Sequence, residues 1–368
     1  MNILHVISSP ASGGAEVYVK DLSKHLSQQH NLHVAFLSAA TDTGRDTEYE
    51  RVFLEDLQFA GVSTYIIGNE TRKKPWLGAL RLKTYIKNNK IDIVHTHLAY
   101  GIVFSALSQV PVVYTHHNIT QRWGETTYKI FNILVNEYVG ISDICATALS
   151  KYTGKKVNTI FNAVSLDKFE GYSRTRTLSS ISTNIINVAM VGALHPQKNY
   201  LNMLNALTLL DKEIRDQIIV LIAGEGEKNY KDELLSYIEK HNLQNTVRFI
   251  GVTSNIPQFL YDADLFVMSS DWEGLPIALT EAAISGLPCI VTNAGGCSEI
   301  IDRSKNGVVV PLSNPQALAN EISKVIISKS LIEQWSQNAI NSAEQYSINK
   351  AADLHINLYN SILSKKSI

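Results

Sequence analysis

The stretch "DLFVMSSDWEGLPIALTEAAISGLPCIVTN", residues 264–293, decides the fold of this chain. Apolar runs of strand length stand at its two ends, and Pro276 suits the first turn of a helix between them. Both runs are nearly continuous rather than alternating, which favours strands buried on both faces of a parallel sheet. The stretch therefore predicts one strand–helix–strand unit.

The same rhythm of strand and helix occurs in two series along the chain. In the first series we predict strands at 2–7, 32–38, 62–68, 91–97, 110–116 and 137–142, with helices near 15–29, 47–60, 76–89 and 121–136. The second series has strands at 184–192, 218–224, 247–251, 264–270, 287–293 and 307–312. Helices near 314–328, 331–345 and 349–363 follow.

The segment 170–184, "EGYSRTRTLSSISTN", is rich in Ser and Thr and separates the two series as a linker. We therefore expect an α/β architecture of two doubly wound domains, 1–169 and 185–348, facing a cleft. The segment 349–368 is expected to be a C-terminal helix that packs back on the N-terminal domain.

The composition indicates an ordinary globular protein of about two domains. The chain has 368 residues, of which 45% are hydrophobic and 18% charged, and its net charge is −1. A nucleic-acid partner is not expected, because such binders carry a large positive balance. No run approaches the roughly 18 apolar residues of a membrane span, and the N-terminus lacks the features of a secretion signal. Three cysteines without ligand spacing imply neither a disulfide framework nor zinc, so a reducing cytoplasm is expected.

Ligands of such sheets bind at the carboxyl ends of the strands, so the loops there are the candidate sites. The loop "SSPASGGAEVY" places Gly13 and Gly14 at a helix N-terminus, where backbone N–H groups can face an anion. A tight turn explains this loop equally well. In "VGALHPQKNY", Lys198 stands at a helix start and could meet a diphosphate, or could be a solvated surface lysine.

Glu273 and Glu281 enclose a Gly-Leu-Pro turn after the strand 264–270. A carboxylate accepts both hydrogens of a vicinal diol, so two acids could hold a ribose and a hexose. Alternatively, Glu273 favours the helix dipole and Glu281 is solvated. Gly295 and Gly296 follow the next strand and suggest backbone donors for a phosphate or sugar, although a turn would also explain them.

Histidines occur at two neighbouring strand ends, in "HTH" at His95 and His97 and in "THHN" at His116 and His117. Four imidazoles could bind a metal. No carboxylate or thiolate accompanies them, so sugar-hydroxyl binding or ordinary packing is favoured. The "DAD" at 262–264 matches the D-x-D of metal-dependent sugar transferases, but it precedes a buried strand and is not interpreted as a metal site.

These residues together resemble the retaining nucleotide-sugar glycosyltransferases of family four, which have the GT-B fold. The resemblance covers nearly the whole chain. Glu273 and Glu281 look like the ends of the family's E-x7-E motif. The other matching pieces are Gly13-Gly14-x-Glu16, "FNAVSLDKF" at 161–169, "IAGEGE" at 222–227 and "TNAGGCSEII" at 292–301.

The resemblance implies a role for each matching residue of the second domain. Glu281 would bind the nucleotide ribose. Glu273, with the neighbouring backbone of Gly274 and Leu275, would hold the donor hexose. Lys198 would hold the diphosphate and stabilise the leaving group.

Further roles follow for the remaining loops. Gly13 and Gly14 would also hold the diphosphate, and the backbone of Gly295 and Gly296 would face the donor. His117 would touch the sugar and the reacting face. Such enzymes use no obligatory metal, so no cofactor is expected. The family's favoured mechanism is front-side attack, in which the leaving phosphate takes the acceptor's proton, and no protein nucleophile is named.

Two positions depart from the family pattern. Ala193 stands where an arginine or another polar residue is usual, which removes one phosphate cation and places more of the task on Lys198. Ala163 follows Asn162 where glycine is common, and this changes a backbone preference rather than the chemistry.

The segment 72–90 carries seven basic residues and no acid, with Trp76, Leu77 and Leu80 among them. Such a segment can lie on an anionic membrane or form a solvated helix face. The sequence thus favours transfer of a hexose or N-acetylhexosamine from a nucleotide sugar, most simply a UDP-sugar, to a sugar or lipid-linked sugar. This activity would serve surface polysaccharide or glycolipid synthesis in the cytoplasm or on the inner face of the plasma membrane. The alternatives are a nucleotide-sugar epimerase of the same fold and a non-catalytic nucleotide-sugar binding protein.

Overall fold

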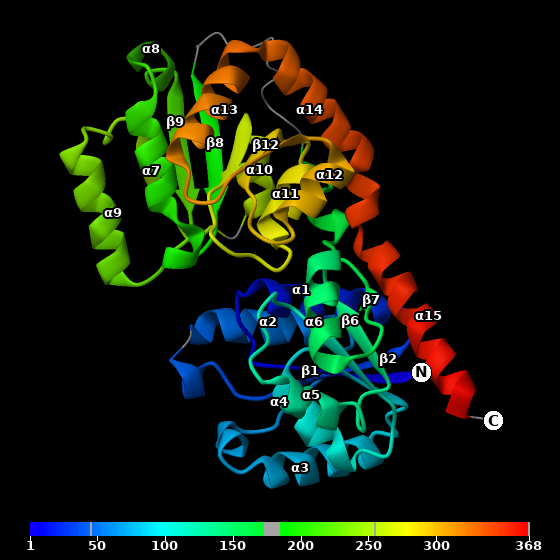
Figure 1. Ribbon diagram of the computed structural model, residues 1–368. Helices are drawn as coiled ribbons and strands as arrows, with labels where there is room; N and C mark the ends of the chain where they lie inside the picture. The colour runs from blue at the N-terminus through cyan, green and yellow to red at the C-terminus, as the bar shows by residue number, and fades with distance from the viewer. Residues whose placement is uncertain (45, 173–184, 254, 367–368) are drawn as a thin grey trace. The chain divides into compact units, whose positions relative to one another are not determined.

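Two separate parallel sheets organise the protein in a computed structural model, which describes residues 1–44, 46–172, 185–253 and 255–366 (Figure 1). The chain divides into one unit of Met1–Val164 with Ile348–Ile368 and a second unit of Ser165–Ser347. The first boundary lies five residues before the predicted position 169, since 169 − 164 = 5. Most of the expected linker, residues 173–184, lies outside the described residues.

The first unit contains a seven-stranded sheet with the order β3-β2-β1-β4-β5-β6-β7. Each pair of neighbouring strands is parallel. The strands are β1 Asn2–Ile7, β2 Asn31–Phe36, β3 Ser63–Ile66, β4 Ile93–Thr96, β5 Val112–His116, β6 Glu137–Gly140 and β7 Asn158–Thr159. The helices are α1 Gly14–Leu26, α2 Thr47–Phe59, α3 Pro75–Asn88, α4 Ala99–Phe104, α5 Glu125–Phe131, α6 Asp143–Thr153 and α15 Ile348–Lys366.

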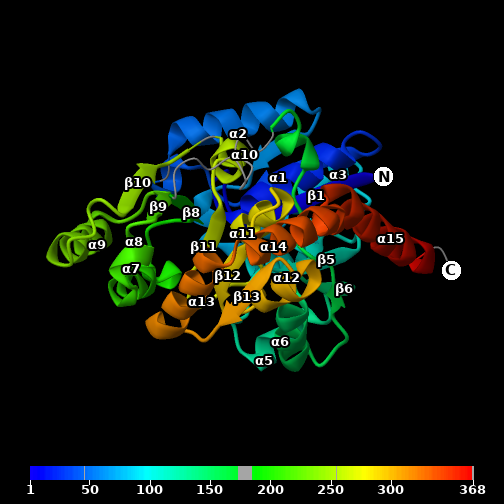
Figure 2. The same cartoon turned by 90° about the horizontal axis from the view of Figure 1, so that it is seen from above.

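Helix α15 belongs to the first unit although it comes last in the chain. It packs against α1, and Figure 2 draws it in red beside α1 and β1. Its Tyr359 is fully buried, and the Tyr359 hydroxyl is hydrogen-bonded to His95 Nδ1 at 2.5 Å. The last helix is therefore held by a buried polar contact as well as by apolar packing.

The second unit contains a six-stranded parallel sheet with the order β10-β9-β8-β11-β12-β13. Its strands are β8 Ile186–Val191, β9 Ile218–Ala223, β10 Val247–Gly251, β11 Leu265–Met268, β12 Cys289–Thr292 and β13 Gly307–Val310. Its helices are α7 Tyr200–Leu209, α8 Lys212–Arg215, α9 Lys228–Lys240, α10 Ile256–Tyr261, α11 Ile277–Ile284, α12 Cys297–Ser304, α13 Pro315–Ile327 and α14 Lys329–Ser342. Helices α7 and α13 pack on each other, as do α11 and α12.

The α/β class and the two parallel sheets confirm the interpretation of the apolar runs, because β11 and β12 are fully buried along their length. The helix expected at 121–136 was too long. Helix α5 covers only Glu125–Phe131, and Asn136 Oδ1 then accepts a hydrogen bond from Val112 N to align β5 and β6. Helix α6 was not predicted, although Ser142 is an N-cap whose hydroxyl accepts from Cys145 N.

Each sheet reverses its winding direction at one pair of strands. The pairs are β1 with β4 in the first unit and β8 with β11 in the second, and the loops after them lie at the edge where α/β proteins bind ligands. Within the described residues, no helix has both the length and the hydropathy that a membrane span requires.

Candidate active site

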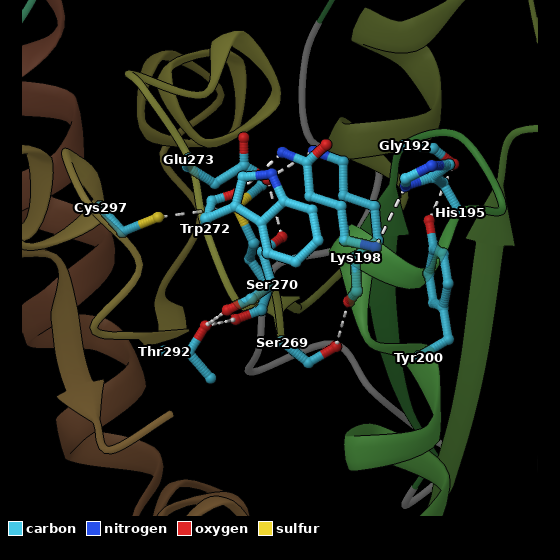
Figure 3. A network of polar contacts seen from close by, with 12 residues as sticks. Gly192, His195, Lys198, Tyr200, Ser269, Ser270, Trp272, Glu273, Thr292 and Cys297 are labelled. Carbon is cyan, nitrogen blue, oxygen red and sulfur yellow. Dashed lines mark hydrogen bonds and ion pairs between the residues drawn. The ribbon is translucent and has the colours of Figure 1, made fainter. Parts of the chain in front are cut away.

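Lys198 and Glu273 form an ion pair at the winding reversal of the second unit (Figure 3). Lys198 follows β8 and Glu273 follows β11, and Lys198 Nζ lies 2.6 Å from Glu273 Oε1. The Glu273 side chain is only 8% exposed and that of Lys198 is 19% exposed. The ammonium therefore offsets the cost of burying a carboxylate.

A second donor reaches the same carboxylate oxygen, since Ser270 Oγ donates to Glu273 Oε1 at 2.7 Å. Ser270 is itself held by the next strand, because Thr292 Oγ1 donates to Ser270 O at 2.5 Å. Gly192 leaves the space for the lysine, as a Cβ there would lie 2.9 Å from Lys198 Cε. The pair is thus positioned by the ends of three adjacent strands, β8, β11 and β12.

The loops after β8 and β11 are joined by hydrogen bonds. Ser269 Oγ donates to the carbonyl oxygens of Lys198 and Asn199 at 3.0 and 2.9 Å. Asn199 Nδ2 donates to Asp271 Oδ1 at 2.9 Å, and Asp271 N donates to Gln197 O at 2.9 Å. Such contacts make Lys198 part of a rigid frame. Sequence reasoning did not identify Ser269, Asn199 or Asp271, because their partners lie 70 or more residues away in the chain.

Gly296 lies in contact with the loop that follows Glu273. Gly296 N donates to Gly274 O at 3.1 Å, and a Cβ on Gly296 would lie 2.3 Å from the same oxygen. Leu275 is buried beneath this contact. The structure therefore brings together the Gly274–Leu275 turn and the Gly295–Gly296 loop, both of which were predicted to face the donor. The absence of a side chain at Gly296 allows the two loops to pack closely. Gly295, at φ 55°, occupies the left-handed region beside it.

Glu281 lies on α11, after the Gly274–Pro276 turn, and its side chain is partly exposed. The predicted placement of one acid in the loop and the other on the helix is thus observed. The "DAD" segment does not form an exposed metal site, because Asp264 is buried and its Oδ2 accepts from Asn187 N at 2.8 Å.

In the first unit, Gly13 is the N-cap of α1 and Gly14 is its first residue, and both are exposed. The Glu16 side chain folds back and accepts a hydrogen bond from Ser8 Oγ. A Cβ on Gly13 would lie 2.3 Å from Glu16 Oε2, so a side chain at this position would make the Glu16 carboxylate move. The loop after β1 therefore presents backbone N–H groups at the start of a 13-residue helix.

The four histidines of the predicted group separate into two environments. His97 Nδ1 and His117 Nε2 are 2.9 Å apart, whereas His116 Nδ1 is hydrogen-bonded to the Tyr114 hydroxyl at 2.8 Å. Burial lowers the pKa of His117 to about 3 and that of His116 to about 4. Both rings are therefore neutral near pH 7, as buried packing or hydroxyl-binding groups require.

Two further histidines join this group, and sequence reasoning missed both. His5 lies within β1 and is fully buried, with Nδ1 2.9 Å from His97 Nε2. His355 comes from α15, and its Nε2 lies 3.0 Å from the Tyr18 hydroxyl. Burial lowers the pKa of each to about 3. His5, His95 and His97 offer ring nitrogens within 4.8 Å of one another, which is close enough for a shared metal ion.

Two family models match successive parts of the chain. The model described as Glycosyltransferase Family 4 matches residues 12–168, and the model described as Glycosyl transferases group 1 matches residues 179–342. The chain belongs to glycosyltransferase family four. The Gly13–Glu16 loop lies within the first match, and Lys198 and the Glu273–Glu281 segment lie within the second. The chain is a hexosyltransferase.

Two relatives of this glycosyltransferase are named for transfer to a lipid-diphosphate-linked sugar and for capsular polysaccharide biosynthesis. It is 27% identical over 385 residues to the UDP-Gal:α-D-GlcNAc-diphosphoundecaprenol α-1,3-galactosyltransferase of Escherichia coli, covering 98% of this chain and 96% of that protein. It is 23% identical to the capsular polysaccharide biosynthesis glycosyltransferase CapH of Staphylococcus aureus, covering 89% and 92%.

A solved structure has the same fold as the transferase. Anabaena Alr3699/HepE in complex with UDP and glucose superposes with a TM-score of 0.80 at 21% identity, covering 98% of this chain and all of that chain. Together with the two Rossmann-like units, this likeness establishes the GT-B fold.

Ala193, which stands where the family usually has an arginine, is exposed in the loop between β8 and Lys198 of this glycosyltransferase. The backbone on either side of Ala193 is tied to the neighbouring strand, because Gly192 N donates to Ala223 O and Leu194 N to Glu225 O, both at 3.0 Å. The loop is thus ordered without the usual arginine, and Lys198 is the cation that this loop contributes.

Proposed function

We propose that this glycosyltransferase moves a hexose or N-acetylhexosamine, with retention, from a UDP-sugar to the sugar of a lipid-linked acceptor in surface polysaccharide synthesis. The observation that carries the proposal is the buried Lys198–Glu273 pair at the winding reversal of the second unit. A cation and a carboxylate side by side suit a ligand in which a diphosphate adjoins a sugar.

The roles follow from the chemistry of each group. Lys198 would attract the diphosphate, and Glu273 with the Gly274–Leu275 backbone would accept and donate hydrogen bonds to the hexose. Glu281 would hold the ribose diol from α11. When Lys198 turns to the phosphate, Ser270 Oγ still donates to Glu273 Oε1, so the carboxylate is not left unpaired.

In the first unit, the amides of Gly13 and Gly14 would hold the diphosphate, and the neutral His117 ring would touch the sugar. The backbone at Gly295 would also face the donor. Transfer proceeds through front-side attack: the acceptor hydroxyl forms the new C1–O bond as the C1–O bond to phosphate breaks, and the departing phosphate takes the hydroxyl proton. Lys198 and the α1 N-terminus would neutralise the diphosphate, so we propose that the reaction needs no metal.

We also propose that the protein works in the cytoplasm, bound peripherally to the inner face of the plasma membrane through α3. The exposed face of this helix carries Trp76, Leu80, Lys83 and Lys87, while Leu82 and Ile86 are buried against the sheet. Arg81 is not available to lipid in the same way, because it pairs with Glu70 at 2.6 Å. A basic face with apolar anchors suits an anionic leaflet that also holds a lipid-linked acceptor.

The test is a mass-spectrometric assay of the purified protein with a panel of UDP-sugars. Each is incubated alone, with a cell lipid extract, and with the extract plus EDTA. A glycosylated lipid product that forms only with extract, and equally with EDTA, would support the proposal. A changed sugar without acceptor would identify an epimerase, and UDP binding without product from any donor would indicate a binding protein. Lys329→Ala, on the exposed surface of α14, serves as the matched control for Lys198→Ala.

A further inference from the structure

The Arg122 guanidinium lies over the ring of Tyr100 in the first unit, with its central carbon 5.8 Å from the ring centroid. Arg122 belongs to the loop between β5 and α5, and Tyr100 belongs to helix α4, which follows β4. Strands β4 and β5 are parallel neighbours, so both connections leave the sheet at its carboxyl edge. The contact therefore joins two loops of the edge at which α/β proteins bind ligands.

The two neighbours of Arg122 in the chain fix its position. Gln121 Nε2 lies 3.5 Å from the His116 Nε2 atom at the end of β5. The Trp123 ring packs edge-on against the Tyr100 ring, with the two centroids 5.6 Å apart. Both neighbours are partly buried, whereas Arg122 itself is exposed. The loop thus presents the guanidinium to the outside from an anchored backbone.

Arg122 has no ion-pair partner among the described residues, and Glu125, three positions further on, does not pair with it. By contrast, Arg51 and Arg81 of the same unit each pair with a glutamate at 2.6 Å. A guanidinium that lies over an aromatic ring can keep its in-plane N–H groups for another partner. Two parallel N–H groups of this kind suit a phosphate. Arg122 is therefore held in place and still open to an anionic ligand.

A row of aromatic rings connects Arg122 with helix α3. Tyr100 and Phe104 both lie on α4, with ring centroids 6.1 Å apart. A Cβ on Gly78 of α3 would lie 2.5 Å from Phe104 Cε1, so α4 packs closely on α3. The exposed face of α3 is the surface that we propose to lie on the membrane. The arginine is thus supported by the same elements that would meet a lipid-linked substrate.

We propose that Arg122 binds the diphosphate of the lipid-linked acceptor, and that Tyr100 is a positioning residue that holds the guanidinium. This inference rests on the proposed function and concerns the acceptor side of that reaction. A sugar joined to a lipid through a diphosphate is strongly anionic next to the sugar, and a bidentate cation suits that group. His97 and His117 come from the same two connections, 2.9 Å apart. An arginine in these loops is placed to hold the acceptor beside the histidine that would touch the transferred sugar.

Two other phosphates compete for this assignment. The diphosphate of the UDP-sugar already has Lys198 and the amides at the start of α1 as its proposed partners. The headgroups of anionic lipids have the lysines on the exposed face of α3. Arg122 lies at neither place, because it comes from the loop that contains His117. The acceptor diphosphate is therefore the phosphate that its position favours.

Farnesyl diphosphate, a diphosphate on a prenyl chain, is the binding probe, and farnesol is its uncharged control. In isothermal titration with saturating UDP present, Arg122→Gln should bind farnesyl diphosphate about tenfold more weakly than the wild-type protein, because hydrogen bonds to a charged group are lost. Arg122→Lys should lie between the two, since lysine keeps the charge and lacks the planar fork. Arg51→Gln makes the same charge change on α2 and should bind as the wild type does. Farnesol should not distinguish the variants.

Equal affinity of Arg122→Gln and the wild-type protein for farnesyl diphosphate, or no binding by either, would overturn the proposal. Tyr100→Phe keeps the ring and should retain the affinity, whereas Tyr100→Leu should lower it about threefold, by the loss of a cation–π contact. Wild-type affinity in Tyr100→Leu would overturn the positioning role.

UDP affinity and vesicle flotation test the two competing phosphates. Arg122→Gln should keep the wild-type affinity for UDP and the wild-type binding to vesicles that contain anionic phospholipid. A clear loss of UDP affinity would assign Arg122 to the donor, and a loss of flotation would assign it to lipid headgroups. Either result would overturn the proposal.

The transfer assay measures the consequence for the reaction. Arg122→Gln should need about tenfold more lipid extract for its half-maximal rate, while its KM for the UDP-sugar stays that of the wild type. An unchanged requirement for extract would overturn the acceptor role. A protein whose binding of farnesyl diphosphate depends on Arg122, but which transfers no sugar from any donor, would refute the proposed function and leave the diphosphate site established.

Discussion

Lys198 Nζ and Glu273 Oε1 lie 2.6 Å apart, although 75 residues separate them in the chain. The pair connects the ends of β8 and β11 and is mostly buried. Substitutions in this pair can be tested separately for their effects on folding and on transfer. Removal of one partner leaves the other charged and desolvated, which lowers stability.

Lys198→Met should lower the free energy of unfolding by about 1–3 kcal/mol, because the buried Glu273 carboxylate loses its cation and keeps the hydrogen bond from Ser270 Oγ. In a Glu273→Gln background, Lys198→Met should lower the free energy of unfolding by less. A double-mutant cycle measured by urea unfolding would show this difference. Lys198→Met should also lower kcat about a hundredfold. Additive effects of the two substitutions on stability would mean that the pair contributes no coupling.

Glu281→Ala should weaken UDP binding about tenfold, since the variant loses a carboxylate that accepts from the ribose diol. Glu273→Ala should instead depress turnover more than UDP affinity. Isothermal titration with UDP and steady-state kinetics separate the two, with the exposed Glu333→Ala on α14 as control. Wild-type UDP affinity in Glu281→Ala would exclude the ribose role.

Gly296→Ala should destabilise the protein by about 1–3 kcal/mol and reduce transfer, because the new Cβ would lie 2.3 Å from Gly274 O and would push the two donor loops apart. The matched control is Gly124→Ala, where φ is −74° and no atom lies within 4 Å of the added Cβ. Thermal unfolding and kinetics would be compared for both variants. Equal behaviour of the two would show that the loop contact is unimportant.

The buried histidines should make stability fall as the solution becomes acidic. Burial lowers the pKa of His5, His117 and His355 from 6.5 to about 3, so between these values the unfolded chain binds more protons than the folded one. Their contribution is complete above pH 6.5 and is lost progressively below it. At pH 5.5 each of these histidines should already have lowered the free energy of unfolding by about 1 kcal/mol.

Urea unfolding at pH 7.5 and 5.5 measures this difference. His355→Leu should reduce it by about 1 kcal/mol, while the partly exposed His241→Gln at the end of α9 is the comparison variant. A pH difference of the same size in His355→Leu and in the wild-type protein would contradict the assignment.

Lys83→Glu combined with Lys87→Glu should weaken binding to vesicles that contain anionic phospholipid by about thirtyfold, corresponding to ~2 kcal/mol for two basic residues. The pair Lys228→Glu and Lys240→Glu on α9 makes the same change in net charge on exposed positions of the second unit. Flotation with anionic and zwitterionic vesicles would compare them. Equal loss in both double variants would show that net charge, rather than the α3 face, governs binding.

Much of the fold could be predicted because it depends on local patterns. Near-continuous apolar runs indicated parallel strands, and the loops after them contained the candidate groups at Lys198, Glu273 and Glu281. The helix at 121–136 was predicted too long, since the segment after α5 is determined by Asn136 contacting Val112 on a different strand. Helix periodicity does not contain such information.

The sequence by itself determined which residue types stand at strand ends, and the spacing of Glu273 and Glu281 around a turn followed directly from it. Only the tertiary structure decided which of these groups meet. Strand order placed β8 beside β11, and so joined Lys198 to Glu273, and it placed β1 beside β4, and so joined His5 to His97. Neighbours in a parallel sheet are set by crossover connections between distant segments, so the partners of a buried polar group cannot be inferred from the residues around it in the chain.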